Sequence, residues 1–284
     1  MTVHNENMHA GHWVKSAKGS HELRGRSLGI IGYGNIGSQL SVLAEAMGMR
    51  VFFYDTADKL ALGNAQRCAT LDELLGVSDV VTLHVDGRPG NSGLFGEELF
   101  ARMLPGSIFL NLSRGFVVDA AALRRHIESG HISGAAIDVF HEEPAAAGDP
   151  FVSDLRGLKN VILTPHIAGS TEEAQQDIGE FVAGKLIAYV EAGTTALSVN
   201  LPSVQMPRRA GTTRLLVLHR NQPGVLVKID GVLAARGFNI EQQVLSTTGA
   251  VGFAVTDVPG AVGPEVVEEL RQMPETIRAE ALLP

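Results

Sequence analysis

The stretch that most constrains this chain is residues 28–37, where a short apolar run breaks into glycines spaced G-x-G-x-x-G. Residues 28–31 have the composition of a buried strand, and residues 38–47 carry apolar side chains at the spacing of one helix face. Residues 51–54 predict a second strand, which ends at Asp55. A strand, a glycine turn, a helix and a second strand with a terminal acid indicate the βαβ unit of a dinucleotide-binding fold.

Each glycine has its own physical task in such a unit. Gly32 permits the tight turn, Gly34 lets the backbone approach a pyrophosphate, and Gly37 lets the helix pack closely on the strand. The helix N-terminus then faces the phosphates with unpaired N–H groups and the positive end of its dipole. The carboxylate of Asp55 can accept hydrogen bonds from a ribose diol and repels a 2′-phosphate, so the pattern predicts NAD rather than NADP as the cofactor.

Size and composition narrow the class of protein. The 284 residues suggest about two domains, and no apolar run is long enough to span a bilayer, so we expect a soluble, cytoplasmic protein without a membrane partner. Cys68 is the only cysteine, which excludes an intramolecular disulfide and a multi-cysteine metal site. The net charge of −8 argues against a nucleic-acid partner.

Residues 1–27 are polar and predict an irregular, solvated connector. Several histidines lie in this segment, but their spacing does not repeat a helix-face pair and no carboxylate cluster accompanies them, so we expect no metal site. The tryptophan, Trp13, is either a core side chain or an interface anchor, and the sequence leaves both open.

After Asp55 the chain alternates between strand-like and helix-like segments. The predicted strands are 79–84, 107–111, 134–140 and 161–163, and the predicted helices are 70–75, 96–103 and 119–129. This alternation predicts a Rossmann-like, doubly wound parallel sheet with helices on both faces, in which ligands bind outside the carboxyl ends of the strands. Polar residues recur at those ends, and this recurrence predicts an enzyme site: Asp55, His84, Ser113, Arg114, Asp138, Glu143 and His166.

The last part of the chain changes character. Residues 170–192 predict a long amphipathic helix, and the stretch from 198 to 211, rich in proline, arginine and glycine, predicts a linker. Beyond it the order of elements is βαββαβ, which predicts a small ferredoxin-like module. Its predicted elements are strand 214–218, loop 219–224, helix 225–236, strands 240–247 and 251–258, helix 264–272 and strand 276–283.

Three of the polar strand ends fit one reaction. Transfer of a hydride from a 2-hydroxy acid to a nicotinamide needs a base for the hydroxyl proton and a cation that binds the carboxylate and polarises the C2 oxygen. His166 can be the base, and Arg114 suits the second task because its fork pairs bidentately with a carboxylate. Glu143 can hold the histidine in one tautomer. Each residue alone also fits an ordinary structural role, whereas all three at one end of a dinucleotide fold predict a dehydrogenase.

Four segments resemble the D-isomer-specific 2-hydroxyacid dehydrogenases, and together they are highly specific for that family. They are GIIGYGNIG at 29–37, NLSRG at 111–115, AIDVF through the EP pair at 136–144, and LTPHI at 163–167. The likeness covers essentially the whole chain and is greatest to members with a C-terminal ACT domain. It implies NAD-dependent oxidation of D-3-phosphoglycerate to 3-phosphohydroxypyruvate, the first step of L-serine biosynthesis.

The resemblance also implies roles for single residues. Arg114 is the expected substrate anchor, His166 the acid–base, and Glu143 its partner; the family pattern selects Glu143 over Glu142 because it immediately precedes Pro144. Asn35 and Ile36 are expected at the pyrophosphate, and Ser113, Asp138 and the stretch His166–Gly169 along the nicotinamide half. The full set of expected cofactor contacts is Gly32, Gly34, Asn35, Ile36, Gly37, Asp55, His84, Leu112, Ser113, Arg114, Asp138, His166 and Gly169.

The C-terminal module resembles a serine-binding ACT domain. Its matching positions are His219, Asn221 and Asn239, the first two of which fall in the predicted loop before the first helix. Side-chain amides there can donate to and accept from a free amino acid across a contact between two ACT modules. The resemblance therefore implies L-serine as an effector and a homo-oligomer formed through the nucleotide-binding and ACT domains.

Family members carry a further segment before the position of Met1, and it holds most of the substrate-binding domain, including basic residues for the substrate phosphate. We therefore expect an N-terminally truncated chain. Its expected parts are an NAD-binding domain at 1–168 with an incomplete first helix, a remnant of the substrate domain with the linker at 169–210, and an ACT domain at 211–284. Two alternatives stay open: a reductase of 2-oxoglutarate or another 2-keto acid, and a non-catalytic fragment that binds NAD and serine.

Two positions depart from the family pattern. Asp86 stands where relatives usually have proline, in the loop after a predicted strand. Ala168 stands where a pair of glycines is common, and its lower backbone freedom is expected to stiffen the link between domains.

Overall fold

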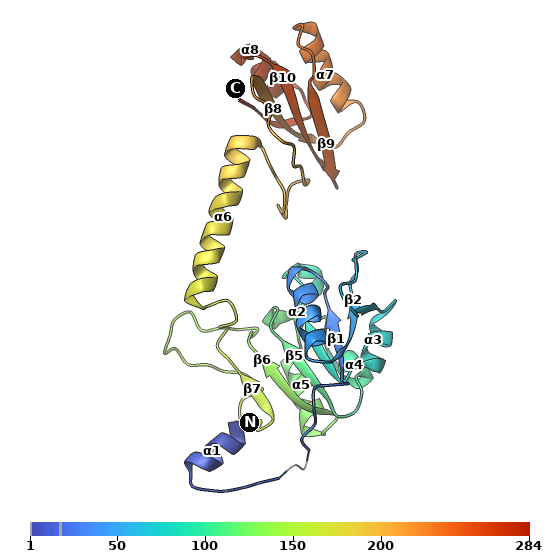
Figure 1. Ribbon diagram of the computed structural model, residues 1–284, viewed down its shortest axis with the longest axis vertical. Helices are drawn as coiled ribbons and strands as arrows, with labels where there is room; N and C mark the ends of the chain where they lie inside the picture. The colour runs from blue at the N-terminus through green and yellow to red at the C-terminus, as the bar shows by residue number, and fades with distance from the viewer. Residues whose placement is uncertain (1, 17–18) are drawn as a thin grey trace. The chain divides into compact units, whose positions relative to one another are not determined.

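The computed structural model describes residues 2–16 and 19–284, so that Met1, Ala17 and Lys18 lie outside the described part. The chain divides into two compact units, Met1–Thr171 and Glu172–Pro284. Figure 1 shows a larger sheet with helices in the first unit, and the long helix α6 and a small sheet with helices in the second. The boundaries expected from the sequence, after residues 168 and 210, stay predictions.

A seven-stranded parallel sheet forms the centre of the first unit, in the order β3-β2-β1-β4-β5-β6-β7. The predicted Rossmann-like α/β fold is thereby confirmed. Because the strand order reverses beside β1, the crevice that binds ligands in such sheets lies at the carboxyl ends of β1 and β4. The elements are α1 (Thr2–His9), β1 (Ser27–Ile31), α2 (Asn35–Ala46), β2 (Arg50–Tyr54), β3 (Gln66–Arg67), α3 (Leu71–Val77), β4 (Val80–Leu83), η1 (Pro89–Asn91), α4 (Glu97–Arg102), β5 (Ser107–Asn111), η2 (Gly115–Val117), α5 (Ala120–Glu128), β6 (Ile132–Ile137) and β7 (Val161–Leu163).

Strand β1 is the central element of this sheet. Its Leu28 lies opposite Val51 of β2 on one side and Val80 of β4 on the other. Every residue of β1 is buried, as expected for a parallel strand covered on both faces. The apolar core continues on either side of this strand, around Phe53 of β2 and Phe109 of β5.

Several local predictions for the first unit were wrong. Residues 2–9 form helix α1 within the segment predicted to be irregular, because that helix has no apolar stripe from which periodicity could reveal it; Gly11, at φ 80°, follows its end. The irregular-connector prediction also covered Met1, Ala17 and Lys18, which lie outside the described residues. Strand β6 ends at Ile137 rather than residue 140, because Phe140 already donates its backbone N–H to the Glu143 side chain in a turn.

Trp13 is exposed, which excludes the core alternative.

The second unit begins with α6 (Glu172–Ala192), on which no residue is buried, and continues into a four-stranded antiparallel sheet in the order β11-β8-β10-β9. The predicted βαββαβ order is confirmed. No described helix is both long and apolar enough to cross a bilayer. The elements after α6 are β8 (Thr212–Arg220), α7 (Val225–Ala235), β9 (Gln242–Thr248), β10 (Val251–Pro259), α8 (Pro264–Gln272) and β11 (Thr276–Leu282).

Strand β8 is longer than the predicted 214–218. It pairs along its length with β10, and residues up to Arg220 take part in that ladder. His219 therefore lies in the strand, opposite Gly252, and the prediction that placed it in the following loop was wrong. A strand boundary of this kind is set by the partner strand, which local composition does not reveal.

Candidate active site

The glycine turn between β1 and α2 forms an open cradle. Gly32 adopts φ 93°, and a Cβ atom there would lie 2.6 Å from the backbone oxygen of His84. A Cβ on Gly37 would lie 2.3 Å from the Gly32 oxygen, whereas one on Gly34 would meet nothing within 4 Å. Gly32 and Gly37 are thus required by close backbone packing, and Gly34 leaves space in front of the helix N-terminus. These residues fit a bound pyrophosphate.

Helix α2 begins directly after this cradle, at Asn35, and Gly34 gives its first turn no side-chain cap. The first N–H groups of the helix are therefore available to an anion. Ile36 is largely exposed in this turn, which leaves its backbone on the open side of the cradle. The structure places Asn35 and Ile36 where the sequence interpretation puts a pyrophosphate, and their contacts with NAD stay predictions.

Asp55 lies at the end of β2 with its carboxylate fixed by two backbone donors. Its Oδ2 accepts the N–H of Tyr33 at 2.8 Å, and its Oδ1 accepts the N–H of Ala57 at 2.8 Å. Each carboxylate oxygen keeps a lone-pair direction for a further donor. The link to Tyr33 ties the acid directly to the glycine turn, so Asp55 is positioned to receive a ribose diol beside the pyrophosphate cradle.

His84 follows β4 at the same edge of the sheet. Its backbone N–H donates to the Ile31 oxygen at 2.7 Å, and its Nε2 lies 3.0 Å from Oγ1 of Thr82. Burial lowers the pKa of His84, so the imidazole is neutral at physiological pH. The His84 ring is thus partly buried beside the glycine turn. The His84 backbone forms the surface against which Gly32 packs.

The loop after β5 is organised by Asn111. Oδ1 of Asn111 accepts hydrogen bonds from the N–H and Oγ of Ser113, at 3.1 and 2.9 Å, and its Nδ2 donates to the Arg114 oxygen at 3.1 Å. Leu112 is exposed between them. Sequence reasoning identified the residues around it and missed Asn111 itself, although its place in the NLSRG motif was the available signal.

Arg114 extends from this loop to the surface. Its Nη1 donates to the Ser113 oxygen at 2.7 Å, while Nε and Nη2 have no hydrogen-bond partner among the described residues. Gly87 lies beside it, since a Cβ built there would be 3.4 Å from the Arg114 Nε. The guanidinium is thus held in place on one side and keeps donors for a planar anion such as a carboxylate.

The turn that carries His166 is held by Asp138. The Asp138 carboxylate accepts from Thr164 Oγ1 at 2.5 Å and from the N–H groups of Ile167 and Ala168 at 3.0 and 3.1 Å. Burial works to raise the pKa of Asp138, but these hydrogen bonds outweigh it and hold the pKa below its ordinary value. Asp138 and Thr164 thereby fix the backbone on both sides of the histidine, a role that the sequence did not indicate.

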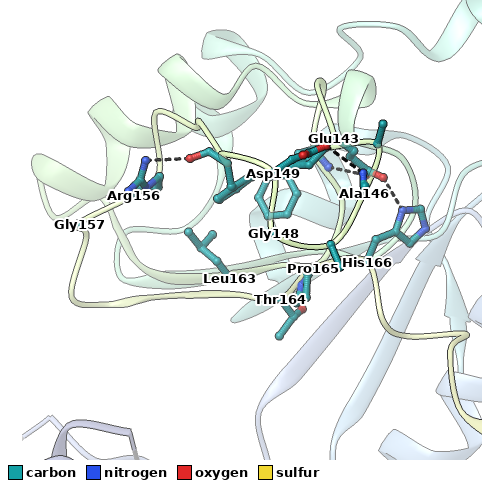
Figure 2. Close-up of a pocket in the computed structure, with 15 residues that line it drawn as sticks. Glu143, Ala146, Gly148, Asp149, Arg156, Gly157, Leu163, Thr164, Pro165 and His166 are labelled. Carbon is teal, nitrogen blue, oxygen red and sulfur yellow. Dashed lines mark hydrogen bonds and ion pairs between the residues drawn. The ribbon is translucent and has the colours of Figure 1, made fainter.

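His166 itself adopts a left-handed backbone conformation, with φ 52°. Its N–H donates to the Thr164 oxygen at 3.0 Å, which closes a tight turn around Pro165. A non-glycine residue in this region persists only where the surroundings impose it, and such residues cluster at functional sites. The conformation directs the imidazole toward Glu143 (Figure 2).

Glu143 and His166 form the central pair of the site. Oε2 of Glu143 lies 2.8 Å from Nδ1 of His166, and Oε1 accepts the Phe140 N–H at 3.0 Å. Burial works to raise the pKa of Glu143, but the hydrogen bonds from His166 and Phe140 outweigh it and keep the pKa below the usual range. The carboxylate is therefore ionised and accepts a hydrogen bond from the protonated Nδ1 of His166. Nε2 of His166 has no partner among the described residues and is left to exchange a proton with a ligand.

A cavity of about 740 Å³ opens beside this pair. Figure 2 shows Glu143 and His166 at one end and Arg156 with Gly157 at the other. Phe140, Phe151 and Leu163 are among the apolar residues that line it. Its volume is in the range of small-molecule sites, and it gives Glu143 a partly apolar environment.

The positions matched to a serine site lie in the second unit. His219 is buried, its Nδ1 lies 2.9 Å from the Arg220 oxygen, and its Nε2 is buried without a partner among the described residues. Asn221 is exposed and donates from Nδ2 to the Gly249 oxygen at 3.1 Å, and Asn239 is exposed between α7 and β9. The unpaired Nε2 is a polar group that a ligand can satisfy.

Comparisons with known proteins agree with this geometry. The family profile for the D-isomer specific 2-hydroxyacid dehydrogenase NAD binding domain matches residues 1–168, and that for the AHAS small subunit-like ACT domain matches residues 215–278. The D-3-phosphoglycerate dehydrogenase of Haemophilus influenzae is 48% identical over 278 residues, which cover 98% of this chain and 68% of that protein. The enzyme of the same name from Dictyostelium discoideum is 45% identical over 97% of this chain and 67% of its own length.

Solved structures of related enzymes share the fold. A D-lactate dehydrogenase from Sporolactobacillus superposes with a TM-score of 0.61 at 30% identity, covering 68% of this chain and 61% of that one. A D-lactate dehydrogenase from Aquifex aeolicus, solved with NAD and lactic acid, gives a TM-score of 0.57 at 31% identity, covering 66% of this chain and 60% of that one. The chain is thus similar to roughly two thirds of dehydrogenases of this type, and a structure in that group holds NAD.

Proposed function

The chain belongs to the D-isomer-specific 2-hydroxyacid dehydrogenases, and on this premise we propose that it oxidises D-3-phosphoglycerate to 3-phosphohydroxypyruvate with NAD. One observation carries the proposal: the Glu143 carboxylate lies 2.8 Å from Nδ1 of a histidine whose other ring nitrogen is free to meet a ligand. Curated relatives at 48% and 45% identity are D-3-phosphoglycerate dehydrogenases, which supports this substrate.

The proposed reaction uses each residue of the pair differently. His166 Nε2 accepts the C2 hydroxyl proton during oxidation and returns it during reduction. Glu143 keeps Nδ1 protonated and stabilises the imidazolium that forms when Nε2 takes the proton. The free donors of Arg114 bind the substrate carboxylate and polarise the C2 oxygen.

NAD, when bound, supplies the acceptor for the hydride that leaves C2. The residues proposed to hold it are those of the glycine cradle and Asp55, whose free lone pairs receive the adenosine ribose. Asp138, Leu112, Ser113 and Gly169 are proposed to line the nicotinamide half through the turns that they shape. All of these residues follow carboxyl ends of strands in the parallel sheet, which supports a shared site.

The test is turnover measured beside binding. NADH oxidation is followed with 3-phosphohydroxypyruvate and with 2-oxoglutarate, and NADH affinity is measured by fluorescence on the same preparation. The proposal expects oxidation with 3-phosphohydroxypyruvate and a much lower kcat/KM with 2-oxoglutarate. NADH binding without turnover on either substrate would instead indicate a cofactor-binding fragment, and a preference for 2-oxoglutarate would indicate a different 2-keto acid reductase.

We further propose L-serine as an effector, bound at His219, Asn221 and Asn239. The unpartnered Nε2 of His219 can pair with an amino-acid ligand, and Gly252 keeps the space beside the ring, where a Cβ would lie 2.3 Å from Cε1. The ACT match supports a small-molecule effector of this kind. Isothermal titration should show heat with L-serine and none with D-serine, and His219→Ala should remove it; absence of heat in the unaltered chain would contradict the proposal.

A homo-oligomer formed through the nucleotide-binding and ACT domains, and a cytoplasmic location, complete the proposal. The exposed Trp13 and the uncovered apolar side chains of α6, such as Phe181 and Leu186, provide surface for association. Sedimentation of the purified chain tests the assembly. A monomer at micromolar concentration would contradict it.

A further inference from the structure

The loop after β4 borders the proposed NAD site. Strand order puts β4 and β2 on either side of β1, so the segment that follows His84 faces the same crevice as Asp55 at the end of β2. Gly87 in this loop lies beside the Arg114 side chain, since a Cβ built on it would be 3.4 Å from the Arg114 Nε. The loop thus lies between the cofactor acid and the substrate anchor.

Asp86 organises this loop. Its Oδ1 lies 2.8 Å from Arg88 Nε and its Oδ2 lies 2.6 Å from Arg88 Nη2, which is a two-pronged pair. Asn91 Nδ2 donates to the Asp86 backbone oxygen at 3.0 Å and to Oδ1 at 2.9 Å. The carboxylate therefore holds Arg88 in one orientation and closes the 3₁₀ turn at Pro89–Asn91 around itself.

Arg88 remains a surface cation in spite of this pairing. Its side chain is 65% exposed, and Nη1 has no hydrogen-bond partner among the described residues. The hydrogen bonds that Arg88 donates to the Asp86 carboxylate raise the pKa of Arg88, and the charge of Asp55 adds to that effect. The guanidinium and the acid that is proposed to receive the ribose stand on the loops after β4 and β2, on either side of the end of β1.

An arginine near the ribose acid is the group that NADP-dependent enzymes use to accept a 2′-phosphate. A guanidinium fork binds phosphate and carboxylate in the same two-pronged way, so the two anions compete for it. In this chain the fork is already filled by a carboxylate only two residues away.

We propose that Asp86 is a specificity-determining residue for the cofactor: by occupying the fork of Arg88, it denies a 2′-phosphate its counter-charge and so reinforces the preference of Asp55 for NAD. This inference rests on the proposed NAD site. It assigns the two acids different tasks. Asp55 receives the ribose diol, and Asp86 keeps the Arg88 guanidinium from pairing with a 2′-phosphate. Removal of Asp86 alone then frees Arg88 for the phosphate.

The test measures NADH and NADPH dissociation constants by fluorescence titration in the complete chain. Asp86→Asn is near-isosteric and keeps an acceptor for Asn91. It should tighten NADPH binding about three- to tenfold, a factor suited to one exposed charge pair, and leave NADH affinity unchanged. The gain should shrink in high salt, because exposed charges are screened.

A double variant separates release of Arg88 from simple loss of a negative charge. Asp86→Asn with Arg88→Ala should bind NADPH as weakly as the unaltered chain does. Glu128→Gln is the matched control, since it removes one exposed carboxylate from an arginine pair on α5, away from the loop, and should change neither constant.

Three results would overturn the inference. If Asp86→Asn leaves the NADPH dissociation constant unchanged, Arg88 cannot reach the 2′-phosphate. A gain that persists in the double variant would assign the effect to general repulsion by Asp86. Failure of the unaltered chain to bind NADH would overturn the proposed cofactor site together with this inference, whereas normal NADH binding with no NADPH effect refutes the inference alone.

Discussion

Two pairs between a carboxylate and a nitrogen base have nearly the same length and opposite surroundings. Glu143 and His166 are joined at 2.8 Å with side chains that are 36% and 49% exposed, at the edge of the first unit's sheet. Arg214 and Asp257 are joined at 2.7 Å in the second unit with side chains that are 0% exposed. Distance alone does not separate a proposed catalytic pair from a structural one.

The difference lies in what remains unpaired. The Arg214 guanidinium donates to both oxygens of Asp257 and to the backbone oxygens of Ala192, Met206 and Pro207, which join the end of α6 and the linker to β8 and β10. His166 keeps Nε2 free and stands on a strained turn. A saturated pair fixes structure, and an unsaturated one at a strand end is available for chemistry.

The largest effect expected from this comparison is loss of turnover on replacement of His166. His166→Ala should lower kcat/KM for 3-phosphohydroxypyruvate reduction by about 10²- to 10⁴-fold, because it removes the proposed general acid–base. Steady-state NADH oxidation measures the change. NADH affinity and the free energy of unfolding should stay close to those of the unaltered chain, since the side chain is half exposed.

His166→Asn is the control for backbone effects, because asparagine tolerates the left-handed conformation that alanine disfavours. Both variants should be equally inactive. Turnover in either variant at the unaltered rate would remove His166 as acid–base, and inactivity confined to the alanine variant would assign the loss to the turn.

Breaking the buried pair of Arg214 and Asp257 should lower the stability of the second unit and leave cofactor binding unchanged. Arg214→Met leaves Asp257 as an uncompensated buried charge and should cost about 3–5 kcal/mol in the free energy of unfolding of the second unit. Hydrogen exchange of the β8 and β10 amides in urea measures the loss. NADH affinity should not change. Arg214→Met with Asp257→Leu should recover most of the stability, and equal stability of the single variant would contradict a structural role.

The same pair makes the second unit sensitive to acid. Burial works to raise the pKa of Asp257, but hydrogen bonds from Arg214 and Gln242 outweigh it and hold the pKa below its ordinary value. A carboxyl group with a lowered folded pKa contributes stability that is present above its unfolded pKa of about 3.9 and is lost as pH falls through the folded value. Acid unfolding of this unit should therefore begin below about pH 4.

Replacement of the histidine's partner should have an intermediate effect. Glu143→Gln keeps a hydrogen-bond acceptor beside Nδ1 but removes the charge that stabilises the imidazolium. We expect kcat/KM to fall about ten- to a hundredfold, the equivalent of one hydrogen bond to a charged group. Stopped-flow measurement of 3-phosphohydroxypyruvate reduction over a range of pH checks this expected fall in kcat/KM. An unchanged rate and pH profile would show that the contact is structural, like that of Arg214.

The smallest expected effect concerns the cofactor acid. Asp55→Ala should weaken NADH binding about tenfold and relax discrimination against NADPH, because the ribose loses one charged acceptor. Paired titrations with both dinucleotides check the change. The N–H of Tyr33 also loses its acceptor, so Asp55→Asn serves as the control that keeps that hydrogen bond. An unchanged preference in both variants would refute the role given to Asp55.

Local patterns predicted most of the fold and supplied the candidate residues of the site. The glycine turn, the strands that flank it and the polar strand ends are local features of composition and spacing, and they include Asp55, Arg114 and His166. Features that depend on distant partners could not be predicted. Asp138 reaches across to the turn at Ile167, and the burial of Arg214 against Asp257 depends on the pairing of β8 with β10.

The boundaries that were wrong have two origins. Strand β8 extends to Arg220 because β10 pairs with it that far, and His219 is consequently part of the sheet. Helix α1 has no apolar face and so carried no periodic signal. The ends of elements and the purpose of buried charges are decided by tertiary contacts, which composition does not encode locally.

Transfer of deuterium from the cofactor tests the central claim most directly. The chain is incubated with 3-phosphohydroxypyruvate and NADH that carries deuterium at the transferable position of the nicotinamide, and the product is examined by mass spectrometry and NMR. The account predicts D-3-phosphoglycerate with one deuterium at C2, formed by the unaltered chain and not by His166→Ala. A chain that binds NADH yet forms no labelled product, or a His166→Ala variant that forms it at the unaltered rate, would contradict the account.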